Sequence, residues 1–198
     1  MSIKTGLAIV IAVAVVVWLK QPSKVELGEG VFAPDEPQQE TIDEPPFLYK
    51  GFEIKPLADF SITAKVILRE DYRYDREAEL SPMDLALGWG NMSDEGVLKH
   101  IDFSQSGRWY RYQYQSAPIS QSEIATHSAN MHMIPAEPWI ESDLEQVKAG
   151  QIIEIKGKLV EATNEQGWTW TSSLTRQDTG GGACELVFVE SIKIIRDG

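Results

Sequence analysis

Three residues in the second half of the chain have the side-chain types that nucleophilic catalysis requires. Cys184 is the chain's single cysteine, and His127 and Asn130 precede it in the sequence. A thiol nucleophile, a histidine base and an orienting amide occur together in cysteine hydrolases and transpeptidases, and Arg196 or Arg176 is suited to stabilise an oxyanion. We therefore take Cys184, His127 and Asn130 as candidate catalytic residues. A small cysteine buried at the start of a strand is the simpler interpretation.

The histidine pair does not favour a metal site. His127 and His132 are separated by five positions, which places them on opposite faces of a strand or about 140° apart on a helix. A single cysteine also excludes a cysteine-based zinc site and an intramolecular disulfide. We expect no metal and no cofactor. The histidine segment is instead expected to fix a loop through buried hydrogen bonds that involve Ser128 and Asn130.

The net charge of −12 argues against nucleic acid as a partner, because phosphate recognition needs clustered Lys and Arg. Unusual aromatic and polar segments favour a protein-binding face instead. The candidate binding residues are Trp89, Trp109, His127, His132 and Arg176.

A non-enzymatic protein-binding or complex-stabilising module is therefore the favoured function. Two alternatives stay open. One is a Cys-dependent extracytoplasmic hydrolase or transpeptidase, which requires Cys184 within reach of His127. The other is a small-ligand or carbohydrate-binding barrel, with a concave pocket lined by Trp168 or Trp170.

The elements that must position these residues lie in residues 47–198. Residues 59–72 alternate apolar and polar side chains and predict a half-buried strand. Further strands are expected at residues 108–115, 151–162, 167–174 and 183–195. Short helices are expected at residues 81–87, 93–100 and 138–148. We predict a mainly β domain of the β-rich α+β class, formed as a small, bent, OB-like barrel with helical insertions. Gly157 is expected to permit a tight bend.

The N-terminal 46 residues consist of an uncharged apolar run followed by an acidic, proline-rich segment. Residues 5–19 carry no charge and would span roughly 22 Å as a helix. We expect residues 1–24 to form a single-pass transmembrane anchor; a cleaved signal peptide is the alternative. Residues 25–46 are acidic and proline-rich, without a basic residue, and predict a solvated tether.

Three stretches together, residues 88–94, 127–136 and 172–185, resemble an uncharacterised family of short bacterial membrane-anchored proteins. They read GWGNMSD, HSANMHMIPA and SSLTRQDTGGGACE. The resemblance supports a bacterial envelope protein and implies no activity. Because signal-anchors usually insert with the N-terminus inside, we expect an inner-membrane protein whose globular domain lies in the periplasm. The expected partners are the membrane and another envelope protein. The Cys, His and Arg set also loosely resembles sortase transpeptidases, but their cysteine ends an apolar strand whereas Cys184 follows glycines.

Overall fold

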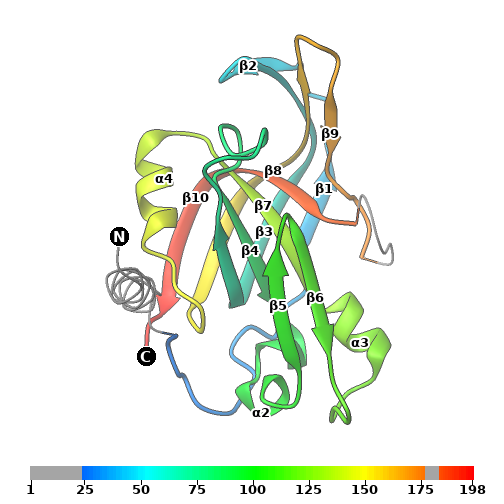
Figure 1. The fold of residues 1–198 in the computed structure, drawn as a ribbon, viewed down its shortest axis with the longest axis vertical. Coiled ribbons are helices and arrows are strands. Elements are labelled where there is room, and N and C mark those ends of the chain that lie inside the picture. The colour runs from blue at the N-terminus through cyan, green and yellow to red at the C-terminus, as the bar shows by residue number, and fades with distance from the viewer. Residues whose placement is uncertain (1–23, 177–182) are drawn as a thin grey trace, which may run out of the picture.

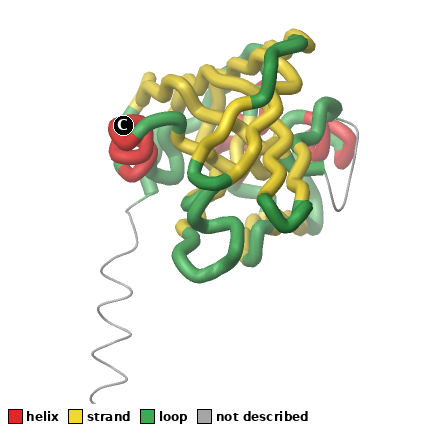
Figure 2. Tube along the Cα trace, turned by 90° about the horizontal axis from the view of Figure 1, so that it is seen from above, coloured by secondary structure: helices red, strands yellow, loops and turns green. Residues whose placement is uncertain are grey.

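The computed structural model describes residues 24–176 and 183–198. It is mainly β, with 47% strand and 13% helix, and its main sheet contains both parallel and antiparallel pairs. This confirms the predicted mainly β class. The strands curve around a common interior and the helices lie outside them (Figures 1 and 2). Residues 1–23, on which the predicted anchor falls, lie outside the described part. Within residues 24–176 and 183–198, no helix has the length and apolar character needed to cross a bilayer.

Ten strands and four short helices follow one another along the described part of the chain. The strands are β1 (Gln38–Thr41), β2 (Phe47–Tyr49), β3 (Phe52–Asp71), β4 (Met83–Gly88), β5 (Asp102–Ser106), β6 (Trp109–Gln113), β7 (Ser128–Pro135), β8 (Ile152–Asn164), β9 (Thr169–Thr171) and β10 (Glu185–Arg196). The helices are η1 (Gly90–Ser93), α2 (Glu95–Leu98), α3 (Gln121–Thr126) and α4 (Pro138–Glu145).

Five of these strands pair in a closed circuit. Strand β3 pairs with β4, β4 with β7, β7 with β10, β10 with β8, and β8 again with β3. The β7–β10 pair is parallel. The long strand β3 makes closure possible because it pairs with β8 from Phe52 to Lys65 and with β4 from Lys65 to Asp71. Strands β5 and β6 form a separate hairpin outside this circuit.

The interior of the circuit is filled by apolar side chains. Phe60, Ile62 and Val66 of β3 belong to this core, which α4 also joins through Ile140 and Leu144. The alternation predicted for residues 59–72 is confirmed from Asp59 to Ala64, where the apolar face points into the core. It breaks after Ala64, because Lys65 and Ile67 are buried as well. The predicted strands at residues 108–115, 151–162, 167–174 and 183–195 correspond to β6, β8, β9 and β10, and the predicted helices at residues 93–100 and 138–148 to α2 and α4.

The predicted secondary structure was wrong for residues 81–87 and for the histidine segment. Residues 81–87, predicted as a helix, contain strand β4 instead, and every residue of β4 is buried. A strand covered on both faces lacks polar alternation, so its pattern does not distinguish it from a helix. The histidine segment, predicted as a loop, forms strand β7. Its polar residues Ser128, Asn130 and His132 are buried against partners described below.

Residues 25–46 lie against the barrel, which differs from the solvated tether that the sequence predicts. Val25 N donates to Ala149 O at 2.7 Å, and Ala33 is fully buried. Oγ of the buried Ser93 accepts from the backbone N–H groups of Phe32 and Ala33 at 3.2 and 3.1 Å. Further along, β1 pairs with β3. The backbone groups of this acidic segment thus find partners in the domain, which offsets the entropy lost on ordering it.

Candidate functional site

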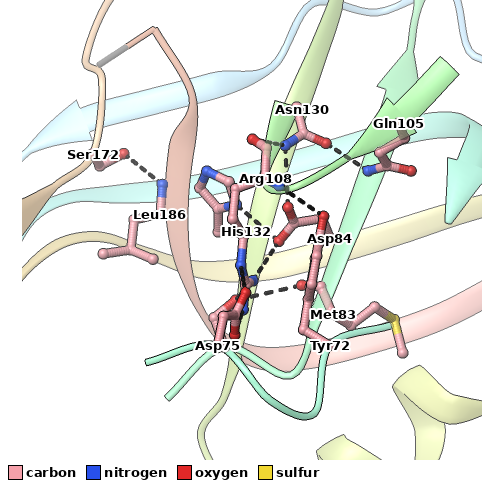
Figure 3. Close-up of polar contacts among 11 residues, drawn as sticks. Tyr72, Asp75, Met83, Asp84, Gln105, Arg108, Asn130, His132, Ser172 and Leu186 are labelled. Atoms are coloured by element: carbon pink, nitrogen blue, oxygen red, sulfur yellow. Dashed lines mark hydrogen bonds and ion pairs between the residues drawn. The ribbon is translucent and has the colours of Figure 1, made fainter. Parts of the chain in front are cut away.

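The hairpin formed by β5 and β6 is fixed to the barrel by the residue at its turn. Gly107 and Arg108 both have positive φ, 57° and 69°, as a two-residue hairpin turn requires. A non-glycine residue is uncommon in this region and needs support from its surroundings. The Arg108 guanidinium supplies it. Nε and Nη2 donate to the two carboxylate oxygens of Asp75 at 2.9 Å each, and the group stacks on the Tyr72 ring at 3.6 Å (Figure 3).

Asp84 of β4 lies at the centre of this network and has no exposed surface. Its Oδ1 accepts from Arg108 Nη1 at 2.9 Å and from His132 Nδ1 at 2.8 Å, while Oδ2 accepts from Asn130 Nδ2 at 3.3 Å (Figure 3). Burial opposes ionisation of Arg108, but Asp75 and Asp84 more than offset it and raise the pKa of the guanidinium. The buried carboxylate is thus paired and hydrogen-bonded, as a stable buried charge must be.

A cavity of about 170 Å³ lies between this hairpin, β7 and the start of β10. Its aromatic wall comes from β6 and consists of Trp109, Tyr110 and Tyr112. The Tyr110 hydroxyl donates to Ser128 Oγ at 3.2 Å, and burial raises the pKa of this phenol. The wall is therefore uncharged at physiological pH.

The polar side of the cavity contains one buried ion pair. Glu185 is 1% exposed and its Oε1 pairs with Arg176 Nη1, while Arg176 Nη2 also donates to Gln39 Oε1 at 3.2 Å. Oε2 of Glu185 has no hydrogen-bond partner among the described residues. The cavity thus combines aromatic rings with the Arg176–Glu185 ion pair.

The structure brings some of the predicted site residues together and separates others. Cys184, Asn130, Trp109 and Arg176 all line the cavity. His127 does not: its Nε2 contacts Glu36 Oε1 at 2.9 Å and its Nδ1 lies 3.1 Å from Glu123 O. The predicted base is therefore turned toward the N-terminal segment, and none of its interactions is with the Cys184 thiol.

Two further binding candidates are buried rather than presented to a partner. Trp89 has no exposed surface, and its Nε1 donates to Glu36 Oε2 at 2.8 Å. His132 is 3% exposed and packs against Trp170, with 4.6 Å between the ring centroids. The large indole of Trp89 joins the core, because burial of its apolar area outweighs any gain from exposure. The prediction that Trp89 contributes to an exposed face is wrong.

Neither the carbohydrate alternative nor a metal centre gains support. Trp168 and Trp170 pack against a second apolar cluster around Phe52 and Phe188, and the barrel interior is filled. In the described ranges, no group of three or more His, Cys, Asp or Glu side chains is placed to hold a metal ion.

Asp84 and Glu185 were not identified from the sequence as site residues, and the contact of Arg108 with Asp84 was not predicted. A signal for Asp84 was present: it is one acid within the apolar run Met-Asp-Leu-Ala-Leu, and such an acid must be paired if the run is buried. The Ser-Gly-Arg-Trp sequence at residues 106–109 is compatible with a hairpin turn. No pattern indicated that the Arg108 side chain folds back to β4.

Comparison with known proteins identifies no relative: no family model, no curated protein and no solved structure matches the chain.

Proposed function

We propose that this chain is a non-enzymatic binding domain with an OB-like barrel, tethered to a bacterial inner membrane and located in the periplasm. The closed five-strand circuit β3-β4-β7-β10-β8 supports the OB-like assignment, and OB barrels bind ligands at their second and third strands and adjoining loops. The equivalent strands here are β4 and β7, which carry the Asp84 network. The uncharged residues 5–19 support the membrane location.

The observation that carries the proposal is the cavity between β6, β7 and β10. Pockets for whole small-molecule ligands are usually about 300–1,000 Å³, whereas this one is about 170 Å³. It is large enough for one side chain of a partner protein, and interfaces commonly gain most of their affinity from such inserted anchors. Trp109, 45% exposed and lining the cavity, is a side chain type enriched at such positions.

The same geometry argues against the hydrolase alternative. A general base must lie within hydrogen-bond reach of the nucleophile that it activates. His127 instead contacts Glu36 and Glu123, and His132 is buried against Asp84 and Trp170. Binding therefore fits the cavity better than catalysis.

Site-specific photocrosslinking tests this proposal with the full chain in bacterial membranes. Benzoylphenylalanine in place of Trp109 should give one discrete adduct with another envelope protein. The same residue in place of Trp139, 62% exposed on α4, is the control and should not give that adduct. Filling the cavity with Ala129→Met should remove the adduct. Equal crosslinking from both positions, or adducts with lipid alone, would contradict a protein-binding role for the cavity.

A further inference from the structure

We propose that the end of the domain nearest the anchor docks on the bilayer surface, with Ile194 and Ile195 of β10 in contact with anionic phospholipid. This membrane-proximal end consists of residues 24–26, 148–151 and 193–198. The inference rests on the proposed membrane location and adds to it the orientation in which the domain is held.

The apolar contact comes from two consecutive isoleucines near the end of β10. Ile194 is 40% exposed and Ile195 is 51% exposed. The register with β8 shifts at this point: Ile194 pairs with Ile153 and Arg196 with Ile152, so Ile195 has no partner in the register. Such a bulge re-aims side chains and interrupts the alternation of a strand. Contact with water is unfavourable for these two side chains, and a lipid interface would remove it.

The isoleucines lie where the described chain leaves the anchor. Val25 N donates to Ala149 O at 2.7 Å, and a Cβ on Gly198 would lie 3.6 Å from Val25 Cγ1 (Figure 1). Leu19 ends the uncharged run six residues before Val25, and six extended residues reach at most roughly 22 Å. A bilayer that holds residues 5–19 therefore lies within that distance of the membrane-proximal end.

The charge of the membrane-proximal end suits an anionic lipid surface. Its basic residues are Lys24, Lys148, Lys193 and Arg196, and its acidic residues are Glu26 and Asp197. Lys24 also pairs with Glu95 at 3.4 Å. The whole chain has a net charge of −12, so an anionic surface repels the protein on average. Basic residues beside a membrane segment are attracted to such a surface, which favours an orientation with this end toward the lipid.

Docking in this orientation leaves the cavity accessible to a partner. Cys184 and Glu185, at the start of β10, line the cavity. Ile195 follows Glu185 by ten residues, which is about 30 Å along a strand at ~3.3 Å per residue. The lipid contact and the cavity thus lie at opposite ends of the same strand, and one does not compete with the other.

Isoleucine-methyl NMR of the full chain in lipid nanodiscs provides the test. Lipid headgroups that carry a gadolinium chelate broaden the signals of methyl groups close to the bilayer surface. In nanodiscs that contain phosphatidylglycerol, the methyls of Ile194 and Ile195 should be broadened and that of Ile54 should not. Ile54 pairs with Ala162 of β8, whereas Ile194 pairs with Ile153 of the same strand, roughly 30 Å away. Nanodiscs of phosphatidylcholine alone should give weaker broadening.

Two variants separate the apolar and the electrostatic contributions. Ile195→Ser should reduce the broadening at Ile194. Lys193→Gln should lower the ratio of docked to undocked domain roughly fivefold in phosphatidylglycerol, the effect of one basic side chain near an anionic surface. Leu48→Ser is the matched control, because Leu48 is 83% exposed on β2, far from the C-terminus (Figure 1), and it should change neither. The comparison of Ile194 with Ile54 needs no variant.

Flotation of the full chain with lipid vesicles separates this inference from the proposed membrane location. A chain that does not float after an alkaline wash would refute both. If the chain floats and Ile194 and Ile195 are broadened no more than Ile54, the docking is wrong and the anchor stands. Equal broadening in the two lipid compositions would remove the role of anionic lipid. Shifts at the two isoleucines that need more than one chain per nanodisc would assign this end to contact between copies instead.

Discussion

Arg108 Nη1 donates to Oδ1 of the fully buried Asp84 at 2.9 Å. This contact joins the turn of the β5–β6 hairpin to β4 of the barrel, and thereby sets the position of the aromatic wall on β6. The bidentate contact to Asp75 and the stacking on Tyr72 hold the same guanidinium from the other side. One side chain therefore fixes a turn, a loop and a barrel strand to one another.

Replacing Arg108 should destabilise the protein strongly. Arg108→Ala leaves the Asp84 carboxylate buried with its charge uncompensated, and breaking a buried pair in this way costs about 3–5 kcal/mol. Arg108→Lys should recover only part of this, because an ammonium lacks the planar fork that serves two carboxylates. Urea denaturation measures both. Arg111→Ala, on the exposed side of the same hairpin, is the control, and a loss for Arg108→Ala no larger than for this control would contradict the assignment.

Ser93 should control the attachment of the N-terminal segment. Its Oγ accepts from Phe32 N and Ala33 N and donates to Gly90 O at 2.7 Å. Ser93→Ala leaves these buried backbone groups without that partner, at a cost of about 1–3 kcal/mol. Hydrogen exchange should then accelerate at Phe32 and Ala33 while the amides of β8 stay protected. Ser104→Ala, at an exposed position of β5, should leave both regions unchanged; equal exchange in the two variants would contradict the role of Ser93.

Gly157 should not tolerate a side chain. A Cβ at this position would lie 2.0 Å from Phe188 O in the backbone of β10, so strands would have to move apart. Gly157→Ala should lower the free energy of unfolding by about 3 kcal/mol or more. Gly51→Ala meets no atom within 4 Å and is disfavoured only by its φ of 80°, which should cost about 1–2 kcal/mol. Thermal or urea unfolding distinguishes the two, and similar values would refute the close approach.

The ion pairs of Lys158 should make the free energy of unfolding fall as the pH rises into the alkaline range. Lys158 Nζ donates to the carboxylates of Asp59 and Glu44. The hydrogen bond to Asp59, whose effect is larger than the opposing effect of desolvation, and the one to Glu44 raise the pKa of Lys158 above its ordinary 10.5. The folded state thus holds this proton more tightly, so the contribution is complete below pH 10.5 and is lost as the pH rises through the folded pKa. Lys158→Met should cost about 0.2–1 kcal/mol for each exposed pair at neutral pH.

The measurement is urea denaturation of wild type and Lys158→Met at neutral pH and at about pH 11–12. The difference between the two proteins should shrink at the higher pH. Lys55→Met, at an exposed lysine of β3, corrects for the general effect of removing one positive charge. A difference that grows with pH would contradict the ion pairs with Asp59 and Glu44.

The sequence predicted strands with one covered face and the long apolar strand β10, and it failed for β4 and β7. Residues 59–64 alternate because this part of β3 buries one set of side chains. Strand β4 is buried throughout, and Ser81 and Pro82 before it resemble a helix start. Strand β7 was obscured by polar residues whose partners, Asp84 and Gln105, lie on other strands. Such pairings are long-range, and local patterns do not contain them.

The candidate site was predictable in its residue types but not in its arrangement. Cys184, Asn130, Trp109 and Arg176 were recognised and do line one cavity. The prediction for His127 depended on how the N-terminal segment folds back, since Glu36 contacts both the histidine and the Trp89 indole. An acidic, proline-rich composition gave no indication of that contact.

The docked N-terminal segment has a mechanical consequence. Its contacts are arranged in series from residue 24: the bond from Val25 to Ala149 comes first, the Ser93 bonds to Phe32 and Ala33 follow, and the β1–β3 pairing comes last. A pulling force at residue 24 should break them in that order while the barrel stays closed. At ~3.3–3.6 Å per extended residue, residues 25–46 would span up to roughly 75 Å once detached. The segment should therefore extend under a load on the domain before the barrel unfolds.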